Sequence, residues 1–245
     1  MLVLGVCTVK VIILAGGAGT RLKPLTNDKP KPMVNIINKP LLEYSINHLK
    51  NQGFTDIALT LGYRAEYIKS YFGDGRDFGV CLTYFIETVP LGTAGGVKAA
   101  SSFIDGDFLV LSGDAFTDIN LEAFSYFHKA KGGLATLALK EVENPEGFGV
   151  VRIDRAKKIT SFIEKPANSE DKLVNTGMYA FKPEILKFIP GGFYDFGKNL
   201  FPRLVGRMFG YPTSNYWNDI GTLSAYYKTN QYVAERPEKF RFLFS

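Results

Sequence analysis

The chain has 245 residues, of which 46% are hydrophobic and 22% charged; this is an ordinary globular composition, and the length suffices for one large α/β domain or two small ones. Its two cysteines lack any Cys/His metal spacing, which argues against a disulfide scaffold or structural zinc site and favours a reducing compartment. No run of about 20 apolar residues is present that could span a membrane. We therefore expect a cytoplasmic protein that binds no membrane.

Strand-like and helix-like segments alternate through the first half of the chain. Runs of successive apolar residues predict strands buried on both faces, and the amphipathic segments between them predict helices. The predicted strands are 10–15, 56–62, 80–87 and 107–114, and the predicted helices are 40–53, 64–73, 93–103 and 120–133. This alternating order implies an α/β fold with a doubly wound, mostly parallel sheet.

The second half of the chain has a different pattern. Apolar segments follow one another closely with short polar connections, which favours antiparallel additions to the sheet. The predicted strands are 134–142, 148–154, 158–164 and 173–181, and helices are predicted at 196–208 and 222–235. We expect one domain over residues 9–236, with 1–8 and 237–245 as terminal extensions. The pattern of the final residues, 236–245, predicts no element.

A glycine-rich loop, LAGGAGTRLKPLT (14–26), follows the first predicted strand. In doubly wound folds, ligands bind at this carboxyl edge of the sheet, and glycine amides can approach a phosphate closely. A dinucleotide loop would require glycine where Leu22 stands, and a P-loop would require GK[ST], which is absent. A tight turn without a ligand would also explain the glycines.

Basic residues surround this glycine loop. The net charge is +5, and the clearest cluster of cations is Arg21, Lys23, Lys29, Lys31 and Lys39. A nucleic-acid-binding surface requires a larger concentrated patch. The placement of the cluster therefore favours a small polyanion and argues against nucleic acid.

The loop, followed by KPKPM (29–33), resembles the opening of the sugar-1-phosphate nucleotidylyltransferases. Further motifs of that family follow in order across residues 9–235: PLGTAGGVK (90–98), SGD (112–114), FGV (148–150), EKP (164–166), NTGMY (175–179) and WNDIGT (217–222). The resemblance implies a Rossmann-like nucleotide-diphospho-sugar transferase fold with three α/β/α layers. In similar enzymes a C-terminal β-helix domain often follows, and we expect none within these 245 residues. The resemblance also implies a homodimer, and an NTP and a sugar 1-phosphate as substrates.

The implied reaction makes a nucleotide sugar and pyrophosphate, and its main difficulty is electrostatic. A phosphate monoester with a second pKa of about 6 is mostly a dianion at neutral pH, so no general base is required. Positioning, cations and metal ions accelerate such transfers. By resemblance the catalytic residues are Arg21 and Lys31 on the triphosphate and Asp114 and Asp219 as ligands of Mg²⁺. Taken alone, each aspartate would also suit a turn or a helix cap.

The same resemblance assigns the two substrate pockets. Glu164 would accept hydrogen bonds from sugar hydroxyls, and Lys165 would neutralise the sugar phosphate. The implied sugar-phosphate-binding residues are Gly149, Glu164, Lys165, Asn175 and Gly177. The implied nucleotide-binding residues are Leu14, Ala15, Gly16, Gly17, Gly19, Thr20, Arg21, Lys31, Glu87, Gly92 and Thr93.

Glu87 bears on the choice of base. Guanine presents two adjacent donors, N1–H and the 2-amino group, which one carboxylate can accept together. This favours GTP, and the overall pattern is most similar to mannose-1-phosphate guanylyltransferases. Three alternatives stay open: a glucose-1-phosphate thymidylyl- or uridylyltransferase, a catalytically silent nucleotide-sugar-binding subunit, and a glycosyltransferase with a similar sheet. The retained charged residues argue against the silent subunit, and the triphosphate loop argues against the glycosyltransferase.

Overall fold

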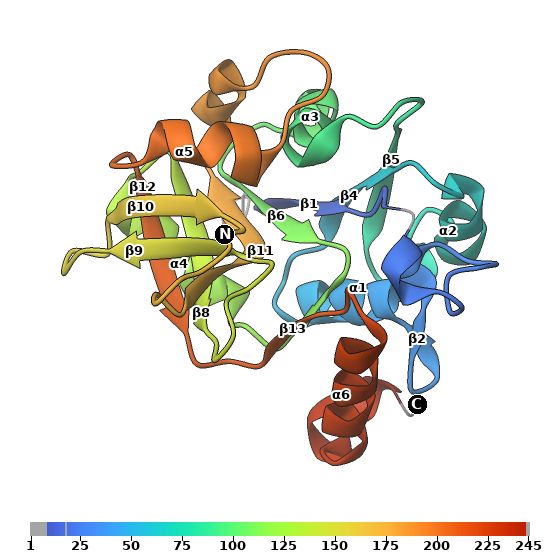
Figure 1. Ribbon diagram of the computed structural model, residues 1–245. Coiled ribbons are helices and arrows are strands. Elements are labelled where there is room, and N and C mark those ends of the chain that lie inside the picture. Colours follow the sequence, from blue (N-terminus) through green and yellow to red (C-terminus); the bar gives the residue numbers. More distant parts are fainter. Residues whose placement is uncertain (1–8, 18, 244–245) are drawn as a thin grey trace, which may run out of the picture.

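The computed structural model describes residues 9–17 and 19–243, which form a nine-stranded sheet with helices on both faces (Figure 1). Its first part consists of four parallel strands in the order β6-β1-β4-β5. These strands are β1 (Lys10–Leu14), β4 (Asp56–Leu61), β5 (Cys81–Ile86) and β6 (Phe108–Ser112). All four were predicted from their runs of apolar residues.

Alternate residues of β1 face two different layers of helices. Val11 and Ile13 belong to one buried cluster and Ile12 to the other, so the strand is covered on both sides. Figure 1 shows α3 and α5 above the sheet and α1 below it. The helices of the first face are α1 (Leu41–Asn51), α2 (Ala65–Phe72) and α4 (Leu121–Lys131); those of the second are α3 (Gly92–Ala99) and α5 (Phe201–Leu204). The doubly wound, three-layer prediction is confirmed.

The second half extends the sheet with antiparallel pairs, as predicted. β11 pairs with both β6 and β8, and β9 and β10 form a hairpin at the far edge. The strands are β8 (Ala135–Glu141), β9 (Gly149–Ile153), β10 (Ile159–Glu164) and β11 (Leu173–Phe181). Because Met178 of β11 pairs with Leu111 near the end of β6, the residues of β11 before Met178 lie at the carboxyl edge of the parallel strands.

The predicted helix 196–208 is wrong in its second part. A π-helical turn (Phe196–Leu200) leads into the short α5, and the chain then turns at Gly206, whose φ is 82°. A residue with this φ cannot continue a right-handed helix. Instead β12 (Met208–Thr213) pairs in parallel with β8.

Two short ladders and a third buried cluster lie outside the main sheet. The cluster consists of Leu22, Ile36, Leu41, Tyr44, Phe116, Ile220, Val233 and Phe240. β7 (Ala115–Thr117) pairs with β13 (Trp217–Asp219), and β2 (Asn35–Ile36) pairs with β3 (Lys39–Pro40). α6 (Leu223–Ala234) has Thr222 as its N-cap, whose hydroxyl accepts the Ala225 N–H at 3.2 Å.

The unassigned end of the chain forms a 3₁₀ helix, Pro237–Leu243, whose Phe240 is buried in this third cluster. The tail therefore packs on the domain, whereas residues 1–8 lie outside the described part of the chain. Of the helices in the described residues, none combines the length and apolar character needed to cross a bilayer.

Candidate active site

A cleft of about 420 Å³ opens where the parallel strands end beside the antiparallel half of the sheet. Most of the predicted catalytic and sugar-phosphate residues line it together. These are Arg21, Asp114, Asp219, Gly149, Glu164, Lys165, Asn175 and Gly177. The residues come from strands far apart in the sequence, so the fold itself assembles this site.

Lys31 links the two predicted catalytic carboxylates. Its side chain is buried, and its Nζ lies 2.6 Å from Asp114 Oδ2 and 3.6 Å from Asp219 Oδ1. Asp114 follows β6, and the β7–β13 ladder brings Asp219 opposite Ala115. The Ile220 N–H also donates to the Asp114 carbonyl oxygen at 2.9 Å. Backbone pairing therefore holds the two carboxylates next to one ammonium group.

The two carboxylates respond differently to this environment. Burial alone would raise the pKa of Asp114, but the Lys31 charge and hydrogen bonds from Lys31 and Ser112 outweigh it and hold the pKa below its ordinary value. Burial and then the negative charge of Asp114 raise the pKa of Asp219, offset only in part by Lys31 and Arg21. Asp219 Oδ1 is buried and accepts no hydrogen bond within the described residues. The pair thus carries negative charge that one lysine does not fully compensate.

The glycine loop begins at the carboxyl end of β1, between its two parallel neighbours. The Ala15 N–H donates to Thr60 O at 2.9 Å, and Leu14 O accepts the Gly113 N–H at 2.9 Å. Gly16 and Gly17 follow directly, and Gly17 has open space where a Cβ would stand. The start of the loop is therefore fixed by the sheet while its glycine backbone stays accessible.

The later part of the loop turns back toward the carboxylates. Gly19 has φ 66°, and a Cβ there would lie 2.7 Å from the Lys31 Cβ, so only glycine fits. Thr20 and Arg21 follow in a 3₁₀ turn and are exposed. A Cβ placed on Gly221 would lie 3.3 Å from Arg21 Nη2 and 3.4 Å from Asp219 Oδ1. The Arg21 guanidinium thus borders the same carboxylate as Lys31.

Glu87 lies just after β5, close to the start of the glycine loop. Its Oε2 accepts the Leu91 N–H at 3.1 Å, and its Oε1 lies 2.7 Å from where a Cβ on Gly96 would stand. Burial raises the pKa of Glu87, and the Leu91 N–H opposes that shift. Because one oxygen is held by a backbone amide, the carboxylate has a defined orientation beside Gly16.

The start of α3 contacts the chain that leads to the π-helical turn. Gly92 has φ 72°, and a Cβ there would lie 2.7 Å from Tyr194 O. The Thr93 hydroxyl donates to Asp195 Oδ2 at 3.0 Å and accepts the Phe196 N–H at 2.8 Å. Within the protein alone, the Thr93 side chain therefore joins these two segments.

At the other end of the cleft, the Glu164 carboxylate lies between two glycines. A Cβ would lie 2.3 Å from its Oε2 if placed on Gly197 and 2.9 Å if placed on Gly149. Burial raises the pKa of Glu164, although the Lys165 charge lowers it, and the two side chains are 3.8 Å apart. Two residues without side chains thus make room for a partly desolvated acceptor.

The remaining predicted sugar-site residues surround this acceptor. Lys165 is exposed and has φ 48°, a left-handed conformation that is uncommon for lysine. Asn175 donates from Nδ2 to the Tyr179 hydroxyl at 3.0 Å and accepts the Gly177 N–H at 3.1 Å. Gly177 has φ 79° and lies against Ser112, so β11 bulges where it passes Asp114.

Several residues of the cleft were missed in the sequence, among them Ser112 and Trp217. The Ser112 hydroxyl donates to Asp114 Oδ1, which orients that carboxylate. Trp217 forms a wall of the cleft, with its Nε1–H donating to Thr176 O at 2.9 Å and its ring 5.3 Å from Phe148. The signals available were the place of Ser112 in the SGD motif and the fact that Trp217 is the single tryptophan.

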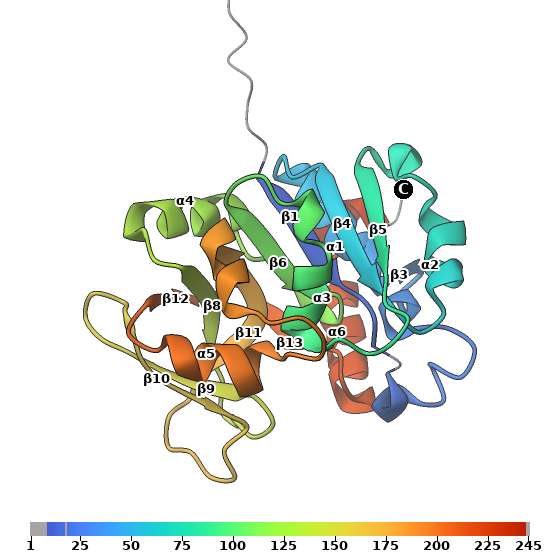
Figure 2. The same ribbon diagram turned by 90° about the horizontal axis from the view of Figure 1, so that it is seen from above.

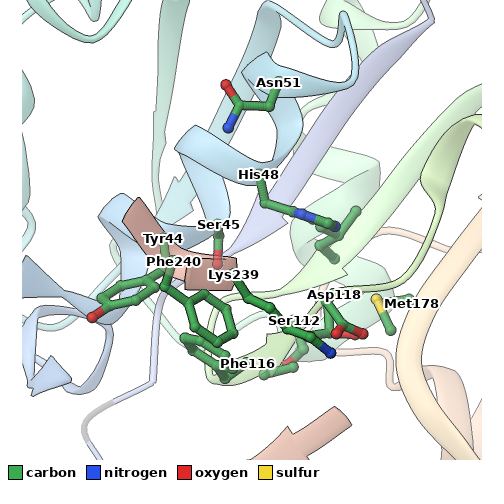
Figure 3. A pocket seen from close by; sticks show the side chains of 13 residues that line it. Tyr44, Ser45, His48, Asn51, Ser112, Phe116, Asp118, Met178, Lys239 and Phe240 are labelled. Atoms are coloured by element: carbon green, nitrogen blue, oxygen red, sulfur yellow. The ribbon is translucent and has the colours of Figure 1, made fainter. Parts of the chain in front are cut away.

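A second, smaller cavity of about 170 Å³ shares Ser112 and Ala115 with the cleft and is otherwise lined in part by residues of α1 and the C-terminal segment (Figure 3). Figure 3 shows Tyr44 and His48 on α1 with Lys239 and Phe240 of the C-terminal segment. His48 Nε2 hydrogen-bonds the Ile119 carbonyl oxygen at 2.8 Å, and burial lowers its pKa. His48 is thus held by a backbone carbonyl oxygen, and the paired charges are found in the larger cleft.

Similarity to known proteins shows the family of this chain. The family model described as nucleotidyl transferase matches residues 10–236, so the chain belongs to the nucleotidyl transferase family. It is 39% identical to the UTP–glucose-1-phosphate uridylyltransferase of Synechocystis, over 94% of this chain and 64% of that protein. It is 37% identical to the mannose-1-phosphate guanyltransferase of Kluyveromyces lactis, over 86% of this chain and 61% of that protein. The chain thus spans less than two thirds of these relatives.

A solved structure resembles most of the fold. HddC from Yersinia pseudotuberculosis, complexed with GMP-PN, matches with a TM-score of 0.80 and 31% identity. The match covers 91% of this chain and 98% of that one. The relatives thus differ in the nucleotide that their names imply, although they share the family.

Proposed function

We propose that the protein transfers a nucleotidyl group from an NTP to a sugar 1-phosphate. An oxygen of the sugar phosphate forms a bond to the α-phosphorus, the bond from that phosphorus to the bridging oxygen of the β-phosphate breaks, and pyrophosphate leaves. The observation that carries the proposal is the contact of buried Lys31 with Asp114 and Asp219, two carboxylates that line one cleft with Glu164 and Lys165. Family membership and the named relatives support the same chemistry.

Each charged side chain has a task in this reaction. The Arg21 guanidinium can fork across two phosphate oxygens and stabilise the departing pyrophosphate. Lys31 brings a buried positive charge to the reacting phosphates. Lys165 offers an exposed ammonium group to the sugar phosphate, and Glu164 accepts hydrogen bonds from the sugar hydroxyls. Because the nucleophile is already a dianion, no proton has to be removed before it attacks.

We propose Mg²⁺ as the cofactor, held by Asp114 and Asp219. The buried Asp219 Oδ1 accepts no hydrogen bond from the described residues, so it is available to a cation. Residues 9–17 and 19–243 contain no cluster of three or more His, Cys, Asp or Glu side chains suited to a metal. One or two carboxylates plus substrate phosphates are the usual surroundings of Mg²⁺, and the ion would supply neutralisation of phosphate charge.

We propose GTP and mannose 1-phosphate as the preferred substrates. Glu87 has one oxygen held by the Leu91 N–H and keeps acceptor capacity for the two adjacent donors of guanine. The guanyltransferase relative and the HddC complex with GMP-PN support this choice.

UTP and glucose 1-phosphate are the second candidate pair, which the uridylyltransferase relative favours. The test is a matrix of NTPs against sugar 1-phosphates, with pyrophosphate release measured with Mg²⁺ and again with EDTA. GTP with mannose 1-phosphate should have the highest kcat/KM, and EDTA should abolish turnover. A clear preference for UTP or dTTP with glucose 1-phosphate would overturn the guanine assignment.

Replacing Glu87 tests base recognition directly. Glu87→Gln places a donor where guanine needs an acceptor, so kcat/KM for GTP should fall about 10- to 100-fold relative to UTP. Competition between the two NTPs in one assay gives this ratio without depending on enzyme concentration. If the ratio of GTP to UTP use is unchanged, Glu87 does not read the base.

A further inference from the structure

The segment between Arg21 and Lys31 has few tethers of its own. The Asn27 N–H donates to Pro24 O at 3.1 Å, and the Thr26 hydroxyl donates to Gly19 O at 2.9 Å. Asn27 and Asp28 are exposed at the tip of the segment. Since the segment joins two cations of the proposed triphosphate site, whatever fixes its tip also affects where those cations lie.

Arg64 holds this tip from a different part of the chain. It stands between β4 and α2, and its guanidinium donates from Nη2 to Asn27 O at 3.1 Å and from Nη1 to Asp28 O. Its Nε donates to the Tyr63 hydroxyl at 3.0 Å, and the guanidinium lies 5.5 Å from the Tyr63 ring centre. All three nitrogens are used, and the rigid fork suits two successive carbonyl oxygens. In Figures 1 and 2 the blue segment after β1 accordingly lies beside α2.

The backbone at Arg64 is adapted to this contact. Arg64 has φ 54°, a conformation that non-glycine residues adopt at an energetic cost and that is concentrated at functional sites. The preceding Tyr63 N–H donates to Gly16 O at 3.3 Å, and a Cβ on Gly62 would lie 3.1 Å from the same oxygen. Residues 62–64 therefore contact two places in this part of the chain: Gly16 at the start of the glycine loop, and residues 27–28 at the tip of the segment that follows it.

We propose that Arg64 is a positioning residue that clamps residues 27–28 and so places Arg21 and Lys31 for the triphosphate. It acts through the loop and contacts neither substrate. A loop already held in its binding conformation loses less entropy when the NTP binds, so the clamp should lower the KM for the NTP. The expected effect on the KM rests on the proposed function, whereas the tethering of residues 27–28 by Arg64 does not.

The first test is amide hydrogen exchange of peptides covering residues 20–31 in the ligand-free protein. Arg64→Gly removes the guanidinium but accepts the same φ, so the turn before α2 should keep its conformation. Exchange in the 20–31 segment should become at least several-fold faster. The matched control is Arg76→Ala, because Arg76 is exposed and pairs with its neighbour Asp74; exchange should then be unchanged.

The second test measures kinetics in the same variants. Arg64→Gly should raise the KM for the NTP about tenfold and leave the KM for the sugar 1-phosphate within twofold. Arg64→Lys should restore part of the loss, since an ammonium group can also donate to two neighbouring carbonyl oxygens, as Lys140 does to Ser214 and Asn215. A general structural defect would instead raise both KM values.

Three results would overturn the clamp. One is unchanged exchange at residues 20–31 in Arg64→Gly. Another is a higher NTP KM without faster exchange, which would mean that Arg64 touches the nucleotide itself. The third is an equal rise of both KM values. The proposed function fails if the unsubstituted protein does not release pyrophosphate from any tested pair of NTP and sugar 1-phosphate. The exchange experiment would still show whether Arg64 holds residues 27–28.

Discussion

The two ends of the cleft differ in how far their charges are satisfied before any substrate binds. At the phosphate end, Lys31 already contacts both Asp114 and Asp219. At the sugar end, the Glu164 carboxylate accepts no hydrogen bond within the described residues, and its nearest cation, on Lys165, is 3.8 Å away. The phosphate end is therefore organised by the protein, whereas the sugar end needs its ligand to satisfy a partly buried acceptor.

The largest effect on activity should come from a substitution at the phosphate end of the cleft. Asp114→Asn removes the charge that Lys31 and the proposed Mg²⁺ share, and we expect pyrophosphate release to fall by about 10³-fold or more. The measurement is steady-state turnover at saturating substrates. Asp105→Asn, a change at an exposed carboxylate paired with Lys10, should keep the original rate. Turnover that survives Asp114→Asn would contradict the assignment.

An intermediate effect is expected at the sugar end. Glu164→Gln weakens an acceptor that meets the sugar hydroxyls, so the KM for the sugar 1-phosphate should rise about 10- to 100-fold while the NTP KM stays constant. Burial raises the pKa of Glu164, so its charged form is disfavoured in the fold, and the neutral variant should unfold at no lower temperature. Glu143→Gln, at an exposed site, serves as the control. Equal changes in both KM values would show that the two ends are not separate.

The smallest effect concerns a residue outside the cleft. His128 on α4 is buried, with Nδ1 2.8 Å from the Thr136 hydroxyl oxygen and Nε2 without a partner in the described residues. Burial, with Lys182 and Lys129 nearby and Asp107 opposing them, lowers the pKa of His128 to about 4. The unfolded state then binds more protons below the ordinary pKa of 6.5, so stability is present above that pH and is lost as the pH falls toward 4.

Between pH 7 and pH 5 this histidine should account for about 2 kcal/mol of lost unfolding free energy. Urea unfolding at the two pH values measures the loss, and His128→Gln should make it smaller. A residual loss is expected from His48, whose pKa burial also lowers. An equal loss in the variant and the parent would contradict the assignment to His128.

The strands of the parallel half could be predicted from the sequence because their pattern lies within each short segment. Runs such as VIIL in β1 are apolar at successive positions, and the sheet buries them on both faces. β12 was missed because it contains Gly210 and Pro212, which are rare in strands. The structure explains both: a Cβ on Gly210 would lie 2.5 Å from Leu139 Cδ1, and Pro212 stands in an edge strand.

The candidate site was predictable to the extent that its residues occur in ordered motifs. Asp114 and Asp219 could be chosen by resemblance, but their shared contact with Lys31 depends on the β7–β13 ladder. Arg64 gave no motif signal, since its partners are backbone carbonyl oxygens of a distant loop. Contacts of a side chain with a remote backbone depend on tertiary geometry, and sequence patterns do not encode them locally.

The β7–β13 ladder also orders events during synthesis of the chain. Asp219 belongs to the last strand, so a growing polypeptide has the glycine loop, Lys31 and Asp114 long before it has the second carboxylate. A nascent chain whose sheet has begun to fold therefore holds an incomplete site. If Asp219 has the proposed role, catalytic competence should appear only when β13 has emerged and paired with β7, so that activity reports the pairing of these two distant segments.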